Sequence, residues 1–137
     1  MKDKYKILAE FVKDCSSETE NIETYLFVKK NISNYKLNVD IYSKPLKNKI
    51  IEINIVLRFE DKNLENKRSH FEINYVVVIK LIDNFDNKKE LKKILLSEIP
   101  NKICPNLVYA FTSLMKSSGF PEVKLNKNID FEKFYND

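Results

Sequence analysis

Apolar and polar side chains alternate along four stretches of the first eighty residues. Alternation with a period of two is typical of β-strands that bury one face, because successive side chains point to opposite sides. The four predicted strands are residues 5–12, 35–42, 51–60 and 71–79. One side of the first strand is predicted to carry Tyr5, Ile7, Ala9 and Phe11. In the other three strands, the odd-numbered positions are predicted to face a helix.

Short polar connections join the second, third and fourth predicted strands. A turn with Pro45 precedes the third strand, and a charged loop at residues 61–67 precedes the fourth. Such short connections join antiparallel neighbours, because a parallel pair needs a crossover of about a dozen residues or more. Strands followed by helices are typical of the α+β class. The pattern does not decide the conformation of residues 22–31, which can form either a loop or a short helix capped by Thr19 or Asn21.

From residue 88 onward the pattern becomes helical, and its apolar arc is wider than one buried face requires. At about 100° per residue, the apolar residues of the second half span roughly 160°, whereas covering a sheet needs little more than ~100°. The surplus indicates a neighbouring subunit, a bound apolar ligand, or a core helix with a ragged edge. Pro100 and Pro105 predict a broken helix, in two pieces of residues 88–99 and 105–118. Gly119 predicts its C-cap.

The sheet face away from the helix is not cleanly polar. A solvated face would carry fewer apolar side chains, and apolar patches above a few hundred Å² usually mark a partner or ligand surface. We therefore expect a homo-oligomer. The apolar positions predicted on this face are Leu8, Val12, Tyr42, Ile50, Val56, Val76 and Val78.

Composition narrows the class of protein. With 137 residues, of which 43% are apolar, the chain is predicted to form one domain of residues 1–137. No run approaches the ~20 apolar residues of a membrane span, so no membrane insertion is expected. The charges at residues 1–5 do not fit a signal peptide, which predicts a cytoplasmic protein. Cys15 and Cys104 are too few for a disulfide framework and are expected to be reduced.

Charge and candidate chemistry argue against several function classes. The net charge is +4, but the basic residues are almost all lysines mixed with acidic residues, whereas nucleic-acid surfaces cluster arginine. Ser69 and His70 are neighbours on a strand, so they point to opposite faces and do not form a catalytic pair. One histidine and two distant cysteines do not make a metal site, and a single glycine, Gly119, builds no phosphate loop. We expect no nucleic-acid partner, no cofactor, no metal and no enzymatic activity.

Five short motifs follow one another along the chain. Residues 12–21 are Val-Lys-Asp-Cys-Ser-Ser-Glu-Thr-Glu-Asn, and residues 70–75 are His-Phe-Glu-Ile-Asn-Tyr. Residues 99–105 are Ile-Pro-Asn-Lys-Ile-Cys-Pro, followed by Gly-Phe-Pro at 119–121 and Ile-Asp-Phe at 129–131. In this order the motifs resemble those of the SecB family of protein-export chaperones, over nearly the whole chain.

The resemblance implies a four-stranded antiparallel sheet backed by a long C-terminal helix, with a very short terminal helix after it. It implies a homotetramer, a dimer of dimers, that acts as an ATP-independent holdase. Such a chaperone binds unfolded precursor proteins and delivers them to the SecA translocation ATPase. The resemblance also implies that the zinc-bearing C-terminal segment of SecA docks on an acidic surface containing Asp14, Glu18 and Glu72. The chain departs from the family in its positive net charge and the absence of an acidic tail.

Two further sets of residues are candidates for binding. Apolar positions in an otherwise polar loop, and others after the long helix, are expected to bind clients: Tyr25, Leu26 and Phe27 in the loop, and Phe120, Val123 and Leu125 after the helix. Apolar helix positions are expected at the oligomer interface: Leu107, Val108, Phe111, Leu114 and Met115. Two alternatives stay open: a SecB-like chaperone of an antitoxin, and a non-enzymatic domain that binds a small ligand or has a structural role.

Overall fold

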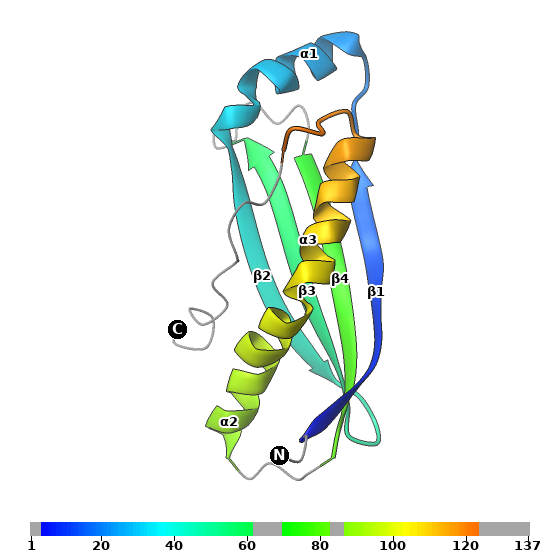
Figure 1. Cartoon of the computed structure of the whole chain (residues 1–137), viewed down its shortest axis with the longest axis vertical. Coiled ribbons are helices and arrows are strands. Elements are labelled where there is room, and N and C mark those ends of the chain that lie inside the picture. Colours follow the sequence, from blue (N-terminus) through cyan, green and yellow to red (C-terminus); the bar gives the residue numbers. More distant parts are fainter. Residues whose placement is uncertain (1–3, 62–69, 83–86, 124–137) are drawn as a thin grey trace.

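The computed structural model describes residues 4–61, 70–82 and 87–123, and shows a four-stranded sheet with a long helix across one face (Figure 1). The strands are β1 Tyr5–Ser17, β2 Tyr35–Pro45, β3 Ile50–Asp61 and β4 His70–Leu81. Their order is β1-β4-β3-β2, and every neighbouring pair is antiparallel. The predicted α+β class, antiparallel meander and four-stranded sheet are confirmed. The helix α1 (Ile22–Asn31) lies between β1 and β2 in the chain, which form opposite edges of the sheet.

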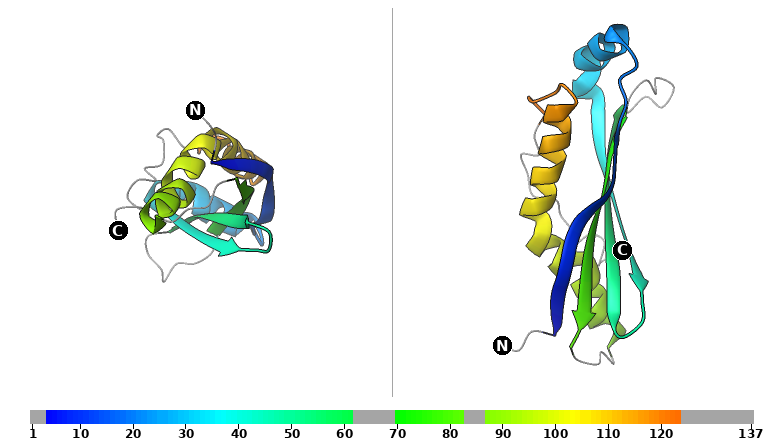
Figure 2. Two further views of the ribbon diagram at one scale, coloured as in Figure 1. Left: turned by 90° about the horizontal axis from the view of Figure 1, so that it is seen from below. Right: turned by 90° about the vertical axis from the view of Figure 1, so that its right-hand side faces the viewer.

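The core lies between the sheet and the long helix, which covers one face of the sheet (Figure 2). Odd-numbered side chains of the central strand β3 form this layer, and Ile53, Ile55 and Leu57 are fully buried. Each such side chain contributes about 1.5–3 kcal/mol when removed from water. The rings of Phe59 and Phe111 join strand to helix edge-to-face, with centroids 5.8 Å apart. The prediction that odd positions face the helix is confirmed for β3.

Strand β1 does not keep one alternation along its length. Its register against β4 shifts between Ile7 and Ala9, and again between Val12 and Asp14. A bulge inserts an extra residue, so the side chains beyond it exchange faces. Ala9 and Phe11 therefore lie on the outer face, opposite Val78 and Val76, and Phe11 is 45% exposed. The prediction that Ala9 and Phe11 share a side with Tyr5 and Ile7 is wrong for this reason.

The first of these shifts, between Ile7 and Ala9, places Glu10 and Val12 on the helix side, which corrects the outer position predicted for Val12. The Glu10 carboxylate accepts hydrogen bonds of 3.0 Å from the Tyr75 hydroxyl and 3.0 Å from the Asn106 amide. Burial, together with the hydrogen bond to Glu10, raises the pKa of Tyr75 to about 12. One carboxylate thus links β1, β4 and the long helix.

The long helix is continuous and consists of three segments. The segment α2 spans Lys88–Lys93, a π-helical turn spans Ile94–Glu98, and α3 spans Ile99–Ser117. In the π turn the Ile99 N–H donates to the carbonyl of Ile94, five residues back. This wider turn comes directly before Pro100, which lacks an N–H for the usual α-helical bond. The predicted separation into two helices therefore does not occur, and α3 continues through Pro105.

The open question at residues 22–31 is resolved as helix α1. Asn21 caps it, because its side-chain oxygen accepts a hydrogen bond of 2.8 Å from the Thr24 N–H. Thr24 and Val28 are buried on its inner side. The helix lies at the end of the molecule where α3 ends (Figure 1). The predicted terminal helix and the predicted client-binding residue Leu125 both lie outside the described residues.

Candidate functional site

Several predicted client-binding residues pack against one another where α1 meets the end of α3. The ring of Tyr25 stacks on that of Phe120, with centroids 5.1 Å apart and an angle of 22° between planes. The Tyr25 hydroxyl donates a 2.9 Å hydrogen bond to the carbonyl of Gly119. Phe120 is fully buried and meets Phe71 of β4 edge-to-face at 5.6 Å. These side chains dock α1 onto the body of the chain.

Only part of the predicted client-binding set is exposed in the chain as described. Phe27 and Val123 are partly buried against the core. Leu26 is 57% exposed, and its neighbour on the helix surface, Ile22, is more exposed still. The exposed apolar surface of α1 is therefore formed by Leu26 and Ile22. Ile22 was missed because its helical face is defined only once residues 22–31 are known to form a helix.

Gly119 adopts the left-handed conformation that its predicted role as a helix C-cap requires. Its φ is 96°, and the N–H groups of Gly119 and Phe120 donate to the carbonyls of Lys116 and Met115. This pair of bonds is the Schellman motif, whose left-handed residue is usually glycine because glycine has no Cβ to strain it. A Cβ here would also meet Tyr25 Cε1 at 2.8 Å. The predicted C-cap is confirmed.

Gly119→Ala is expected to lower the free energy of unfolding by about 1–2 kcal/mol, through the left-handed φ and the contact with Tyr25. Thermal denaturation followed by circular dichroism measures the loss. Ser117→Ala, at the exposed last residue of α3, keeps a helical φ and serves as the control. A melting temperature for Gly119→Ala equal to that of the control would contradict this expectation.

The helix residues predicted at an oligomer interface fall into two groups. Leu107, Phe111 and Met115 are buried against the chain's own sheet. Val108 and Leu114 are partly buried at the edge of that contact. A further residue, Tyr109, is 76% exposed on α3 and was not in the predicted set. The apolar surplus of the helix therefore consists of Val108, Leu114 and Tyr109 rather than the full predicted arc.

The outer sheet face contains a polar hollow of about 500 Å³. The register aligns Asp40 of β2 and Asn74 of β4 with Asp14 of β1 in one row across the sheet. Glu72, in the adjacent row, also lines this hollow. The structure thus brings together two of the three predicted docking carboxylates, Asp14 and Glu72, whereas Glu18 follows the end of β1 and is not among the lining residues.

Sequence reasoning missed two charged residues of this hollow, Asp40 and Arg58. The Arg58 guanidinium donates a 2.7 Å hydrogen bond to the Glu72 carboxylate, and the two residues also pair across β3 and β4. This hydrogen bond to Glu72, with nearby Glu60 and Asp40, raises the pKa of Arg58. The alternation of β2 placed Asp40 on a polar face, but only the strand order puts it in one row with Asp14, which lies on the opposite edge strand. Arg58 partly neutralises the acidic surface.

The described residues offer neither a metal cluster nor a membrane span. No three side chains among His, Cys, Asp and Glu in this part of the chain are grouped to hold a metal ion. Within the same residues, no helix combines the length and the apolar character needed to cross a bilayer. The surfaces relevant to binding include exposed apolar side chains on α1, α3 and β1, and the polar hollow on the outer face.

This fold, an antiparallel sheet of order β1-β4-β3-β2 under one long helix, matches that of a solved SecB-like chaperone. The Mycobacterium tuberculosis Rv1957 SecB-like chaperone, solved in complex with a ChAD peptide from the Rv1956 HigA1 antitoxin, superposes with a TM-score of 0.63. The match covers 90% of this chain and 90% of that one at 8% sequence identity, so it shows the fold alone.

Sequence comparisons define the family. The family described as "Preprotein translocase subunit SecB" matches residues 1–137. A Pelagibacter ubique (strain HTCC1062) protein, provisionally named protein-export protein SecB, is 48% identical over 98% of this chain and 96% of its own length. The protein-export protein SecB of Buchnera aphidicola subsp. Schizaphis graminum is 31% identical over 98% of this chain and 84% of its own length. The chain belongs to the SecB family and is a SecB-type chaperone of protein export, a class of client-binding proteins and not of enzymes.

Proposed function

We propose that this protein is an ATP-independent holdase of the cytoplasm, which binds unfolded precursor proteins and delivers them to the SecA translocation ATPase. Membership of the SecB family over the whole chain carries the proposal. Exposed apolar side chains such as Leu26 and Ile22 of α1 supply a surface of the kind it requires. Burial of apolar area is non-directional, so such a surface accepts many client sequences.

The proposal includes a homotetramer, built as a dimer of dimers. Leu8 and Phe11 are each 45% exposed on β1, which is an edge strand. Tyr109 is exposed on α3, and Val108 and Leu114 are partly buried beside it. An edge strand with exposed apolar residues is a surface that a neighbouring copy can cover.

The holdase is expected to slow the aggregation of a reduced, unfolded client without nucleotide. Leu26→Glu should weaken this protection several-fold, because it places a charge in the exposed apolar surface of α1. Light scattering of the aggregating client measures the effect. Lys30→Gln, also exposed on α1, lowers the net charge by the same single unit; it is the matched control and should retain protection. The chaperone function is excluded if the wild type neither delays aggregation nor retains the client in a pull-down.

Motor docking is proposed for the outer face, at Asp14, Glu18 and Glu72. Two of these carboxylates line the hollow with Asp40, which extends the same acidic surface. A basic segment of SecA would find this surface by charge complementarity, which acts more on encounter rate and specificity than on affinity.

A second candidate function is that of a chaperone dedicated to an antitoxin. The observation that favours it is the fold shared with the mycobacterial chaperone that was solved with an antitoxin peptide. An antitoxin encoded by the neighbouring gene, and co-purifying with this protein, would support this function over general export. A small-ligand or structural domain, the third possibility, predicts no affinity for unfolded proteins, so the aggregation assay separates it from both chaperones.

A further inference from the structure

The polar hollow on the outer sheet face is lined by residues of all four strands. One row of its lining runs from edge to edge of the sheet and consists of Asp14, Asn74, Val56 and Asp40. Neighbouring strands lie about 4.8 Å apart, so the Cα atoms of the two aspartates are about 14 Å apart. One metal ion cannot contact both carboxylates, because metal–oxygen bonds are only about 2.0–2.6 Å long. The row therefore suits an elongated cation and not a compact one.

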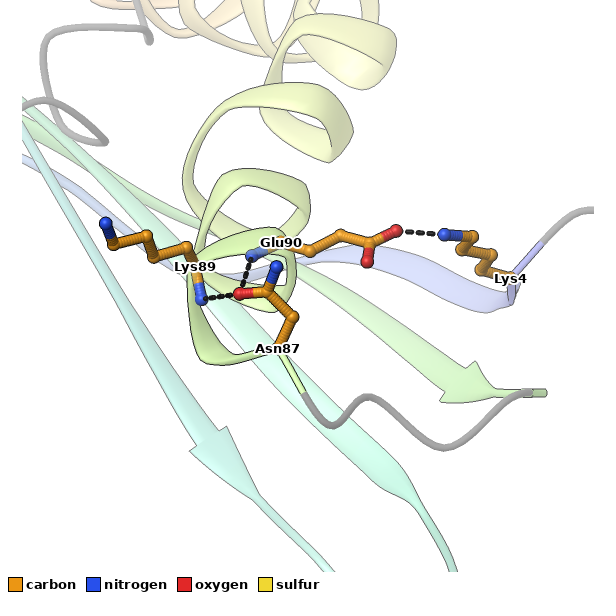
Figure 3. Close-up of polar contacts among 4 residues, drawn as sticks. All are labelled: Lys4, Asn87, Lys89 and Glu90. Carbon is orange, nitrogen blue, oxygen red and sulfur yellow. Dashed lines mark hydrogen bonds and ion pairs between the residues drawn. The ribbon is translucent and has the colours of Figure 1, made fainter.

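The two aspartates supply most of the negative charge in the hollow that is not already neutralised. Both are exposed, and neither forms an ion pair within residues 4–61, 70–82 and 87–123. The Glu72 carboxylate, in contrast, is paired with Arg58 inside the hollow. At the start of the long helix, Glu90 is likewise paired with Lys4 (Figure 3). A cation entering the hollow thus meets two carboxylates that have no competing partner in this part of the chain.

Two buried amide oxygens at the hollow also lack a hydrogen-bond donor among the described residues. One is Asn74 Oδ1, in the row between the aspartates. The other is Oδ1 of Asn54, which is fully buried. The Asn54 Nδ2 donates a 3.0 Å hydrogen bond to Glu52, and a carboxylate only accepts, so the amide oxygen is directed away from Glu52, toward Val56 and the hollow. Buried acceptors without a donor are unfavourable, and a bound ammonium group supplies the donor.

We propose that the hollow binds a linear aliphatic polyamine, such as spermidine, stretched across the strands. Its terminal ammonium groups pair with Asp14 and Asp40, and its inner ammonium group donates to Asn74 Oδ1. The methylene segments lie against Val56 and Tyr42, which also line the hollow. An extended chain advances about 1.2 Å per bond, so spermidine is roughly 11 Å long and reaches both carboxylates. Putrescine, at roughly 6 Å, reaches only one of them.

Two diamines of equal charge and different length test the proposed bridge between the aspartates. Isothermal titration calorimetry with the full-length protein at low salt is expected to show that octamethylenediamine, which is as long as spermidine, binds about fivefold more tightly than putrescine. The longer diamine contacts one more carboxylate, and an exposed ion pair contributes up to about a factor of five. Equal affinities for the two diamines would overturn the proposal.

Neutralising either aspartate is expected to remove the dependence on length. Asp14→Asn and Asp40→Asn should each bind the two diamines almost equally, because only one of the bridging carboxylates remains. Glu98→Gln makes the same change in net charge at an exposed residue outside the hollow and should keep the fivefold difference. Circular dichroism first checks that each variant is folded. If the aspartate variants keep the difference, or if Glu98→Gln loses it, the hollow is not the site and the proposal is overturned.

Spermidine itself tests the role of the buried oxygen. Asn74→Leu removes this acceptor with little change in side-chain volume. It should weaken spermidine binding about tenfold, because a hydrogen bond to a charged group is lost. Octamethylenediamine has no inner ammonium group, so its affinity should change much less. Equal losses for the two ligands would overturn the proposed mode of binding.

Bound polyamine is expected to compete with the SecA segment, because Asp14 also belongs to the proposed docking surface. This consequence alone rests on the proposed function. If spermidine binds as described and does not displace the SecA segment, the polyamine site stands and docking at Asp14 fails. If spermidine does not bind while the SecA segment does, the polyamine site is overturned and the docking proposal stands.

Discussion

Phe111→Asp is expected to unfold the chain, whereas Leu114→Asp should leave it folded and dissociate the oligomer. Phe111 is 1% exposed and packs edge-to-face on Phe59. Losing a buried phenylalanine costs about 3–5 kcal/mol, and burying an unpaired carboxylate adds a penalty. Together these approach the ~5–15 kcal/mol that stabilises a whole domain. Leu114 is only partly buried, so its carboxylate can reach water in a monomer.

Circular dichroism and light scattering after size-exclusion chromatography measure the two effects. Wild type is expected at the mass of a tetramer, Leu114→Asp at a lower mass with native helix content, and Phe111→Asp without a cooperative melting transition. Asn101→Asp introduces the same carboxylate at an exposed position of α3 and should behave as wild type. A wild type that is monomeric at micromolar concentration would count against the oligomer. Native-like melting of Phe111→Asp would contradict its role in the core.

The second large effect is expected on the docking face. A variant with Asp14→Asn, Glu18→Gln and Glu72→Gln should bind the C-terminal segment of SecA roughly tenfold to a hundredfold more weakly. Each exposed pair contributes at most about 1 kcal/mol, so three sum to at most ~3 kcal/mol, which sets the upper end of this range. The loss through Glu72 is expected at the lower end, because Arg58 already competes for that carboxylate. Folding and client binding should be unchanged.

Titration of the SecA segment at two ionic strengths decides this prediction. A control with Glu23→Gln, Glu98→Gln and Glu122→Gln removes three exposed carboxylates elsewhere and changes net charge equally. The docking variant should lose affinity and salt dependence, whereas the control should keep most of both. Equal affinities for the two variants, or binding that ignores salt, would assign Asp14, Glu18 and Glu72 to the ordinary solvated surface.

The sequence by itself determined the elements that depend on local pattern. Odd-position alternation identified the inward face of β3, because side chains in a strand alternate with a strict period of two. Gly119 marked the end of the long helix, because the left-handed C-cap excludes most other residues. Asn21 was a candidate cap before the helix at residues 22–31 was established. These signals act within a few residues, so they can be interpreted without knowing the neighbours in space.

The tertiary structure alone decided the features that depend on which segments lie together. The bulges in β1 follow from its pairing with β4, and they move Phe11 outward and Glu10 inward. The strand order brings Asp40 and Arg58 to the docking residues, although nothing near them in the chain indicates this. Packing of α3 on the sheet buries Phe111 and leaves Leu114 only partly buried. The apolar pattern of the helix in the sequence did not distinguish these two residues. Long-range contacts set these properties, and local pattern does not encode them.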